Sequence, residues 1–188
     1  MNALFDWIQS RYTPDSQLLS ILSQHTRRLH FRKNQVVLSP GQSQSDVWFV
    51  SRGLLMVYTE DADHKQHIAD FIPAGDFLLD VDSFIFSAQT DYFVQTLEET
   101  FVLAITHDDV RRLYEAEPRF REFCLHVKRD CNRRSLRRTL LLTMPTVNRY
   151  AEFCSWFPST TITRRQVSNY LGIPYSTLNR IIHSKAIV

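Results

Sequence analysis

The sequence predicts an α+β protein with an antiparallel β-roll (jelly roll), then a long helix, then a small helical region. Three observations lead to this class. Short β-branched and aromatic runs separated by turn-formers fill residues 29–106, and the helical period returns from residue 107. The charge also changes sign, because residues 1–110 hold 7 Lys or Arg against 15 Asp or Glu, whereas residues 111–188 hold 15 against 5. Only the second part should attract polyanions.

Length and composition exclude several classes of protein. The 188 residues are 44% hydrophobic, which excludes a disordered chain, and only 4 are Gly, which excludes a collagen-like one. No apolar stretch approaches 18 residues, so no membrane partner is expected, and the beginning of the chain does not resemble a signal peptide. The three cysteines, an odd number, disfavour a disulfide framework and favour a cytoplasmic protein.

The first domain is expected to cover residues 1–117. Residues 2–28 have partly helical spacing that breaks near Pro14, after which Asp15 or Ser16 could cap a second helix. The strands of the roll follow. Thr106 is then expected to cap a short helix that leads to the end of the domain.

A long helix is predicted from Pro118 to about Thr143, with Pro145 ending it. Its apolar residues form one interrupted stripe. The stripe consists of Phe120, Phe123, Cys124, Val127, Cys131 and Leu141. Such a seam is typical of dimerisation, and the candidate contacts between two copies are Phe120, Cys124, Val127 and Cys131. The alternative is that the stripe packs on the chain's own roll.

Residues 146–188 contain an amphipathic helix that Pro158 stops, and then two short amphipathic helices joined by a turn. Thr163 and Gln166 have capping-box spacing, and Gly172 supplies a left-handed turn position. The residues expected to face inward are Val167, Tyr170, Leu171, Ile173, Leu178, Ile181 and Ile182. This is the anatomy of a helix-turn-helix, for which an ordinary helical hairpin is the alternative.

The outward face of the last helix carries side chains that can read base edges or hold phosphates in a major groove. These residues are Tyr175, Ser176, Thr177, Asn179 and Arg180.

The run RRQVSNYLGIPYSTLNRII resembles the helix-turn-helix of the cyclic-AMP receptor / fumarate-nitrate reduction regulator (Crp/Fnr) family of bacterial transcription regulators. PGQ, SRGLLMVY and PAGDF sit where that family places the turns of its roll. The resemblance covers nearly the whole chain. It implies a cyclic-nucleotide-binding-like sensor roll over residues 1–117, a dimerisation helix over 118–145 and a DNA-binding helix-turn-helix over 146–188.

The resemblance also implies partners and roles. The protein would be a homodimer that binds double-stranded DNA, with RNA polymerase as a further partner. Arg164 and Arg165 would hold phosphates, and Tyr175, Ser176 and Arg180 would read bases. Arg180 is the candidate for reading guanine, a phosphate contact being the alternative.

The chain departs from the family in two places. The family's nucleotide cassette opens with Gly-Glu and closes with an Arg, whereas here Gly75 and Asp76 open it and Thr90 and Asp91 stand at its close. No Lys or Arg lies between them, so a cyclic phosphate would have no cation, and cyclic AMP is not expected as the effector. A neutral or cationic ligand fits these four residues better; solvated turn residues are the alternative. The sequence also reaches only Val188, so the helix-turn-helix is expected to lack a full wing.

No catalytic or metal-binding motif stands out. His64 and His67 are three residues apart, which places them on opposite faces of a strand, so neither a metal nor a cofactor is expected. The sequence has no P-loop and no recognisable Ser/His/Asp arrangement, so an enzyme is not expected.

Cys124 and Cys131 could form a redox switch or be small buried residues. The long helix also carries a basic run, which is either a solvated face or a contact with the DNA backbone or with an acidic partner. That run is Arg133, Arg134, Arg137 and Arg138.

The sequence therefore predicts a cytoplasmic, homodimeric, DNA-binding transcription regulator with an unknown effector. Two alternatives stay open. One is a ligand-binding signalling module with a vestigial helical tail and no DNA role. The other is a cupin-like metalloenzyme.

Overall fold

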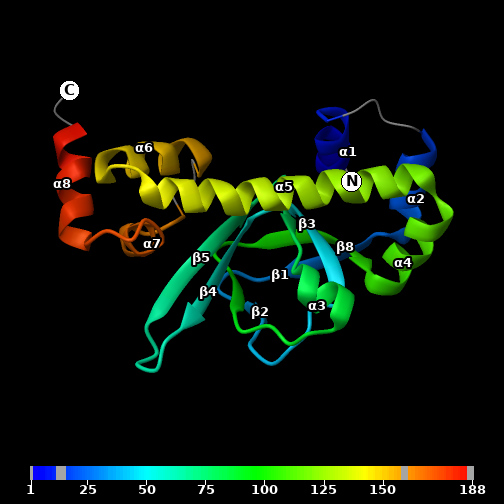
Figure 1. Ribbon diagram of the computed structural model, residues 1–188, viewed down its shortest axis with the longest axis horizontal. Coiled ribbons are helices and arrows are strands. Elements are labelled where there is room, and N and C mark those ends of the chain that lie inside the picture. Colours follow the sequence, from blue (N-terminus) through cyan, green and yellow to red (C-terminus); the bar gives the residue numbers. More distant parts are fainter. Residues whose placement is uncertain (1, 12–15, 158–160, 186–188) are drawn as a thin grey trace.

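The computed structural model describes residues 2–11, 16–157 and 161–185 (Figure 1). Two helices come first, α1 (Asn2–Gln9) and α2 (Ser16–His25), so the predicted interruption falls between them. The breaking Pro14, the candidate cap Asp15 and the predicted stop Pro158 lie outside the described residues.

Within the described residues, eight strands form the predicted antiparallel roll as two four-stranded sheets, in the orders β1-β8-β3-β6 and β2-β7-β4-β5. The strands are β1 (Arg27–Phe31), β2 (Val36–Leu38), β3 (Asp46–Arg52), β4 (Leu54–Glu60), β5 (Gln66–Pro73), β6 (Phe77–Leu78), β7 (Phe93–Thr96) and β8 (Thr100–Thr106). Residues from both sheets, among them Val50, Leu55, Val94 and Ala104, form the roll's own core.

One element was not predicted, the helix α3 (Val81–Phe86) between β6 and β7. The Asp80 side chain caps it by accepting hydrogen bonds from the backbone N–H groups of Asp82 and Ser83, both at 3.1 Å. The six residues of α3 are too few to show a helical period, so the sequence pattern left them unassigned.

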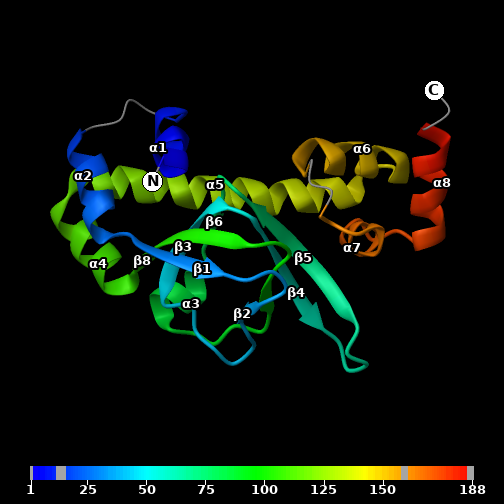
Figure 2. The same cartoon turned by 180° about the vertical axis from the view of Figure 1, so that it is seen from behind.

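The long helix follows the roll as predicted. Helix α4 (His107–Ala116) begins after Thr106, whose Oγ1 accepts a hydrogen bond from the backbone N–H of Asp109. Helix α5 (Pro118–Thr143) has 26 residues, which makes it about 39 Å long. Figure 2 shows α5 crossing the roll, with α1 and α2 near one end and the C-terminal helices at the other. None of the helices in the described ranges is long and apolar enough to cross a membrane.

The stripe predicted as a dimer seam faces the chain's own roll. Phe120 and Val127 are buried in one cluster with Phe49 of β3 and with residues of α1 and α2. Cys124 and Cys131 pack, partly buried, against the same cluster. The prediction that Phe120 and Val127 contact a second copy is therefore wrong, because contacts within the chain bury both side chains. The same apolar spacing serves either partner, so the sequence pattern could not distinguish the two.

The outer face of β4 and β5 is covered by the C-terminal helices α6 (Thr146–Trp156), α7 (Arg164–Tyr170) and α8 (Tyr175–Lys185). One cluster joins Met56 and Phe71 of the strands to Phe153, Tyr170 and Leu178, one from each of these helices. The ring centres of Phe71 and Tyr170 are 5.2 Å apart. The C-terminal helices are therefore packed against the roll rather than detached from it.

Candidate nucleic-acid interface

Helices α7 and α8 have the predicted helix-turn-helix geometry. Thr163 begins α7 with a capping box, because its Oγ1 accepts from the backbone N–H of Gln166 at 3.3 Å and Gln166 Oε1 accepts from the backbone N–H of Thr163 at 2.8 Å. Gly172 has a φ of +62°, and its backbone N–H donates to Asn169 O at 3.1 Å. This left-handed position turns the chain before α8 begins.

The residues expected to face inward do so. Val167, Tyr170, Leu171, Ile173, Leu178 and Ile181 are buried, and Ile182 is partly buried against them. Their packing fixes the angle between α7 and α8, so the outer face of α8 is presented on a rigid frame.

The candidate base-reading face of α8 is open to solvent. Tyr175, Ser176 and Arg180 are exposed, and Thr177 and Asn179 are half-buried. The Arg180 Nη2 donates to Thr177 Oγ1 at 3.3 Å, which holds the guanidinium along the helix. All five predicted residues of α8 therefore lie within about two turns of one helix.

The two arginines of α7 border this face. Arg164 and Arg165 are exposed in the first turn, and Arg164 Nη1 donates to Asn179 Oδ1 at 3.3 Å. The start of α7 and the outer face of α8 are thus joined by a side-chain hydrogen bond. Residues 146–188 hold five Lys or Arg and a single acid, a balance that attracts polyanions.

Arg149 of α6 is a positioning residue that the sequence did not single out. Its Nε donates to Met144 O at 2.8 Å and its Nη1 donates to Leu171 O at 3.0 Å. These carbonyls lie at the ends of α5 and α7, so one side chain joins the long helix to the helix-turn-helix. No local pattern marks Arg149, because Leu171 is 22 residues away.

The arginine run of α5 has two parts. Arg133 is exposed, and the Arg137 guanidinium lies 4.2 Å from the ring centre of Trp156. Arg134 and Arg138 bond instead to groups of the roll and of α7. Of the predicted roles, only an acidic contact describes Arg134, and its acids belong to the chain's own roll.

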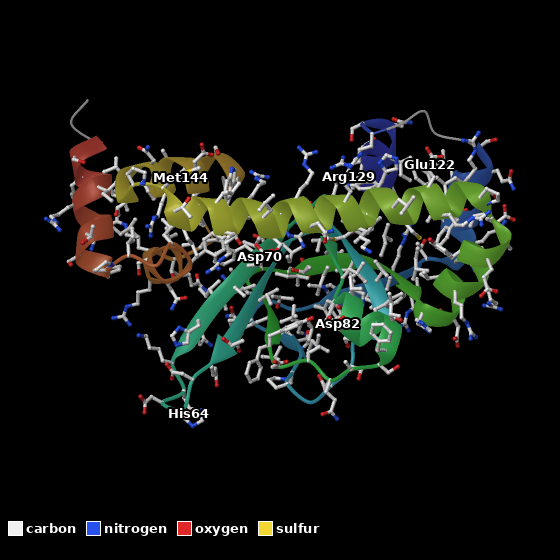
Figure 3. The ribbon with its side chains drawn as sticks, viewed as in Figure 1. His64, Asp70, Asp82, Glu122, Arg129 and Met144 are labelled. Atoms are coloured by element: carbon white, nitrogen blue, oxygen red, sulfur yellow. The ribbon has the colours of Figure 1, made fainter. Side chains whose placement is uncertain are left out.

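Arg134 joins α5 to two carboxylates of the roll. Its Nε donates to Asp70 Oδ2 of β5 at 2.8 Å, its Nη1 is 3.6 Å from Asp76 Oδ2, and its Nη2 donates to Phe77 O at 2.8 Å. Figure 3 shows Asp70 lying close to α5. Burial raises the pKa of Asp70 and of Asp76, and the charge of Arg134 opposes that rise.

Helix α7 is bonded to the backbone of β5. Asn169 Nδ2 donates to Gln66 O at 2.7 Å, and Asn169 Oδ1 accepts from the backbone N–H of Ile68 at 2.7 Å. Arg138 Nη2 adds bonds to Ile68 O at 3.0 Å and to Tyr170 O at 3.4 Å. These bonds fix the helix-turn-helix relative to the roll.

The four candidate ligand-pocket residues lie in separate surroundings. Gly75 is in a turn with a φ of +89°, and Asp76 beside it faces Arg134. Thr90 is buried in another loop, where its Oγ1 donates to a backbone carbonyl at 3.3 Å. Asp91 is exposed. The cation that the structure places beside Asp76 comes from α5, which the sequence of the cassette did not reveal.

The histidine pair and the cysteines have ordinary surroundings. His67 Nε2 is 2.7 Å from Asp61 Oδ2, and His64 lies at the tip of the β4–β5 hairpin (Figure 3). No group of three or more metal-ligating side chains occurs among the residues described. Cys124 and Cys131 are unpaired, and burial raises the pKa of both thiols, which disfavours the reactive thiolate.

Known proteins share this sequence pattern and fold. The sequence model of the cyclic nucleotide-binding domain matches residues 28–117. The regulatory protein YeiL of Escherichia coli O157:H7 is 26% identical over 164 residues, which cover 85% of this chain and 74% of YeiL. The anaerobic regulatory protein of Haemophilus influenzae is 26% identical over 170 residues, 83% of this chain and 65% of that protein. The chain thus spans less than two thirds of the latter relative.

Solved structures extend the likeness to the C-terminal helices. The c-di-GMP responsive regulator CLP of Xanthomonas campestris superposes with a TM-score of 0.70 at 15% identity, covering 92% of both chains. A CRP/FNR-family transcriptional regulator of Thermus thermophilus gives 0.68 at 16% identity, covering 85% of this chain and 86% of the other. These relatives are regulators rather than enzymes by name. Residues 28–117 therefore form a cyclic nucleotide-binding-type domain, and the chain has the fold of the CRP/FNR family of transcription regulators.

Proposed function

We propose that this protein is a transcription regulator that binds double-stranded DNA as a homodimer and reads an inverted-repeat operator. The observation that carries the proposal is the open face of α8, with Tyr175, Ser176 and Arg180 exposed and Arg164 bonded to its edge. Such a face suits a major groove, which admits one α-helix. The unpaired cysteines agree with action in the cytoplasm.

Each side chain has a role in this proposal. Arg180 donates two hydrogen bonds to a guanine, a contact worth about 1–3 kcal/mol of discrimination. Arg164 and Arg165 bind phosphates and set the register of the helix on the duplex. Arg149 and Asn169 do not touch DNA and act as positioning residues through the contacts described above.

The dimer is proposed on the face of α5 that the roll leaves uncovered. Leu136 and Leu140 are 58% and 51% exposed and fall on the side of α5 away from Phe120. Exposed leucines aligned on a long helix favour pairing with a second copy. Two-fold pairing places the two α8 helices in successive major grooves, about 34 Å apart.

The effector is proposed not to be cyclic AMP. Arg134 is the cation that pairs with Asp76, and it is already engaged with Asp70, Asp76 and the Phe77 carbonyl. A cyclic phosphate would meet two carboxylates competing for that charge. Calorimetric titration with cyclic AMP should therefore give no binding heat.

Selection of bound fragments from a random duplex library tests the proposal. The wild type should enrich an inverted repeat, and Arg180→Ala should lose preference at one base pair in each half-site. Arg165→Ala should weaken binding to all sequences alike and reduce the salt slope by about 1. Arg28→Ala, at an exposed arginine of strand β1 in the roll, is the control and should change neither. Transcription with RNA polymerase on a selected site would then distinguish activation from repression.

Recovery of no motif, together with binding that vanishes as salt rises, would contradict the proposal. Only non-specific attraction to the basic half would remain, and the ligand-binding signalling module would become the better account.

A further inference from the structure

An apolar cavity of about 360 Å³ lies between the β3–β8 sheet and the helices α4 and α5. Phe49 and Leu103 line it from the sheet, and Val110, Phe123 and Cys124 line it from the helices. Its volume is within the range of small-molecule sites. The four candidate ligand-pocket residues, Gly75, Asp76, Thr90 and Asp91, do not line it, although residues between the two ends of the cassette, among them Phe77 and Phe84, do.

Two cations from different helices stand among the lining residues. Lys128 of α5 is exposed and has no acidic partner within ion-pair distance in the described part of the chain. Arg111 of α4 is 3.6 Å from Asp108, a pair in which both side chains are largely exposed, so that contact is weak. Glu115 is the one carboxylate among the described residues that line the cavity, which leaves the rim with a net positive charge.

We propose that this cavity binds a small apolar molecule that carries a single anionic group, such as a straight-chain carboxylate. The alkyl part gains from leaving water against Phe49, Leu103 and Phe123. The carboxylate stays at the rim beside Lys128 and Arg111, where it keeps its hydration and gains charge attraction. The ligand would pack against α5, the helix that leads to the DNA-binding helices. This binding does not depend on the proposed DNA function.

Displacement of a fluorescent probe, anilinonaphthalene sulfonate, which has an apolar aromatic body and one anionic sulfonate, by decanoate tests the site. Decanoate should displace the probe from the wild type. Cys124→Phe places a larger side chain in the cavity and should lower decanoate affinity at least tenfold. Cys154→Phe is the matched control, because Cys154 is an exposed residue of α6 and does not line this cavity. No displacement from the wild type, or equal loss in both variants, would overturn the proposal.

The head group is tested by comparing decanoate with decanol. Decanoate should bind the wild type more tightly, and Lys128→Gln should reduce only decanoate affinity, about two- to fivefold, as for a solvent-exposed ion pair. Lys33→Gln, at an exposed turn outside the cavity, should change neither. Equal affinities for acid and alcohol in the wild type would overturn the anionic part of the proposal.

A measurement on the unaltered protein keeps the test independent of how the variants fold. Alkylation of Cys124 should be slow, because burial raises the pKa of its thiol to about 12, and decanoate should slow it further. Alkylation of the exposed Cys154, counted by mass spectrometry in the same sample, should be unchanged. Failure of decanoate to protect Cys124 would place the ligand elsewhere and overturn the assignment.

Discussion

The Arg138 guanidinium lies 5.0 Å from the centre of the Tyr170 ring, and its Nη2 donates to the Tyr170 carbonyl at 3.4 Å. The same nitrogen donates to Ile68 O on β5 at 3.0 Å. One side chain of the long helix therefore holds both a strand of the roll and the first helix of the helix-turn-helix. The arrangement makes the position of the helix-turn-helix depend on contacts from both the long helix and the roll.

Arg138→Gln should lower the free energy of unfolding by about 1.5–3 kcal/mol, because two carbonyls lose a charged donor. It should leave the salt slope of DNA binding unchanged, since Arg138 is bonded within the fold. Urea denaturation and binding at several salt concentrations measure the two effects. Arg133→Gln, at an exposed position of the same helix, should be neutral in stability. A drop of about 1 in the salt slope of Arg138→Gln would instead identify it as a phosphate contact.

Asn169→Ala should loosen α7 from β5. It removes both hydrogen bonds to the backbone of Gln66 and Ile68 and should cost about 1–3 kcal/mol. Hydrogen exchange should report the change locally, with faster exchange at the Ile68 amide than in the wild type. Asn148→Ala, at an exposed position of α6, is the control. Unchanged protection of Ile68 would show that the apolar cluster alone holds the two parts together.

Much of the local structure was predictable because its causes are local. The capping box of Thr163 and Gln166 and the turn at Gly172 each depend on residues within a few positions, and the structure has both. The short β-branched and aromatic runs, with turn-formers between them, likewise predicted the roll.

The partners of α5 were not predictable, because they come from far along the chain. Arg134 is hydrogen-bonded to Asp70, 64 residues away in the sequence, and Arg138 is hydrogen-bonded to Ile68, 70 residues away. A basic run is normally solvated, so nothing in the run itself separates these two from the exposed Arg133. The sequence also did not indicate which side of α5 the roll covers, because an apolar stripe can pack within the chain or against a second copy.

Leu136→Lys should convert a dimer to a monomer. The proposed seam contains Leu136 and Leu140, and a lysine between two copies would bury an unpaired charge. Size exclusion with light scattering at micromolar concentration measures the state. Val36→Lys, at an exposed position of the short strand β2, is the control and should leave the wild-type mass. If the Leu136→Lys protein stays dimeric, the dimer interface lies elsewhere on the chain. If the wild type is monomeric, the proposed homodimer is wrong.

Gly53→Ala should be far more damaging than Gly41→Ala. Both glycines have positive φ, +102° and +84°. A Cβ on Gly53 would lie 2.5 Å from Thr100 Oγ1 and 2.7 Å from the Thr100 backbone, whereas a Cβ on Gly41 meets nothing within 4 Å. Backbone strain alone costs about 1–2 kcal/mol at Gly41, and the clash raises the cost at Gly53 to about 2–5 kcal/mol. Thermal unfolding of the pair checks this, and equal losses would mean that the β3–β4 turn moves freely away from Thr100.

The pH dependence of stability should change in Asp76→Asn. Burial raises the pKa of Asp76 above its ordinary value of 3.8, and Arg134, Arg11 and Arg137 oppose the rise while Asp130 adds to it. The folded state therefore binds the Asp76 proton more tightly than the unfolded state does. The contribution of Asp76 to stability consequently falls as the pH rises from about 3.8 through the raised pKa, and is constant above it.

In Asp76→Asn the side chain does not ionise, so the variant does not lose this contribution to stability as the pH rises. The difference in unfolding free energy, variant minus wild type, should therefore grow more positive across that window and level off towards neutral pH. Urea denaturation at half-unit steps from about pH 4 to about pH 7 measures the difference, with the exposed Asp91→Asn as a control for the substitution itself. A difference that grows more negative with pH would mean that Arg134 stabilises the Asp76 carboxylate by more than burial costs it. In that case Arg134 would be the stronger influence on the turn that opens the cassette.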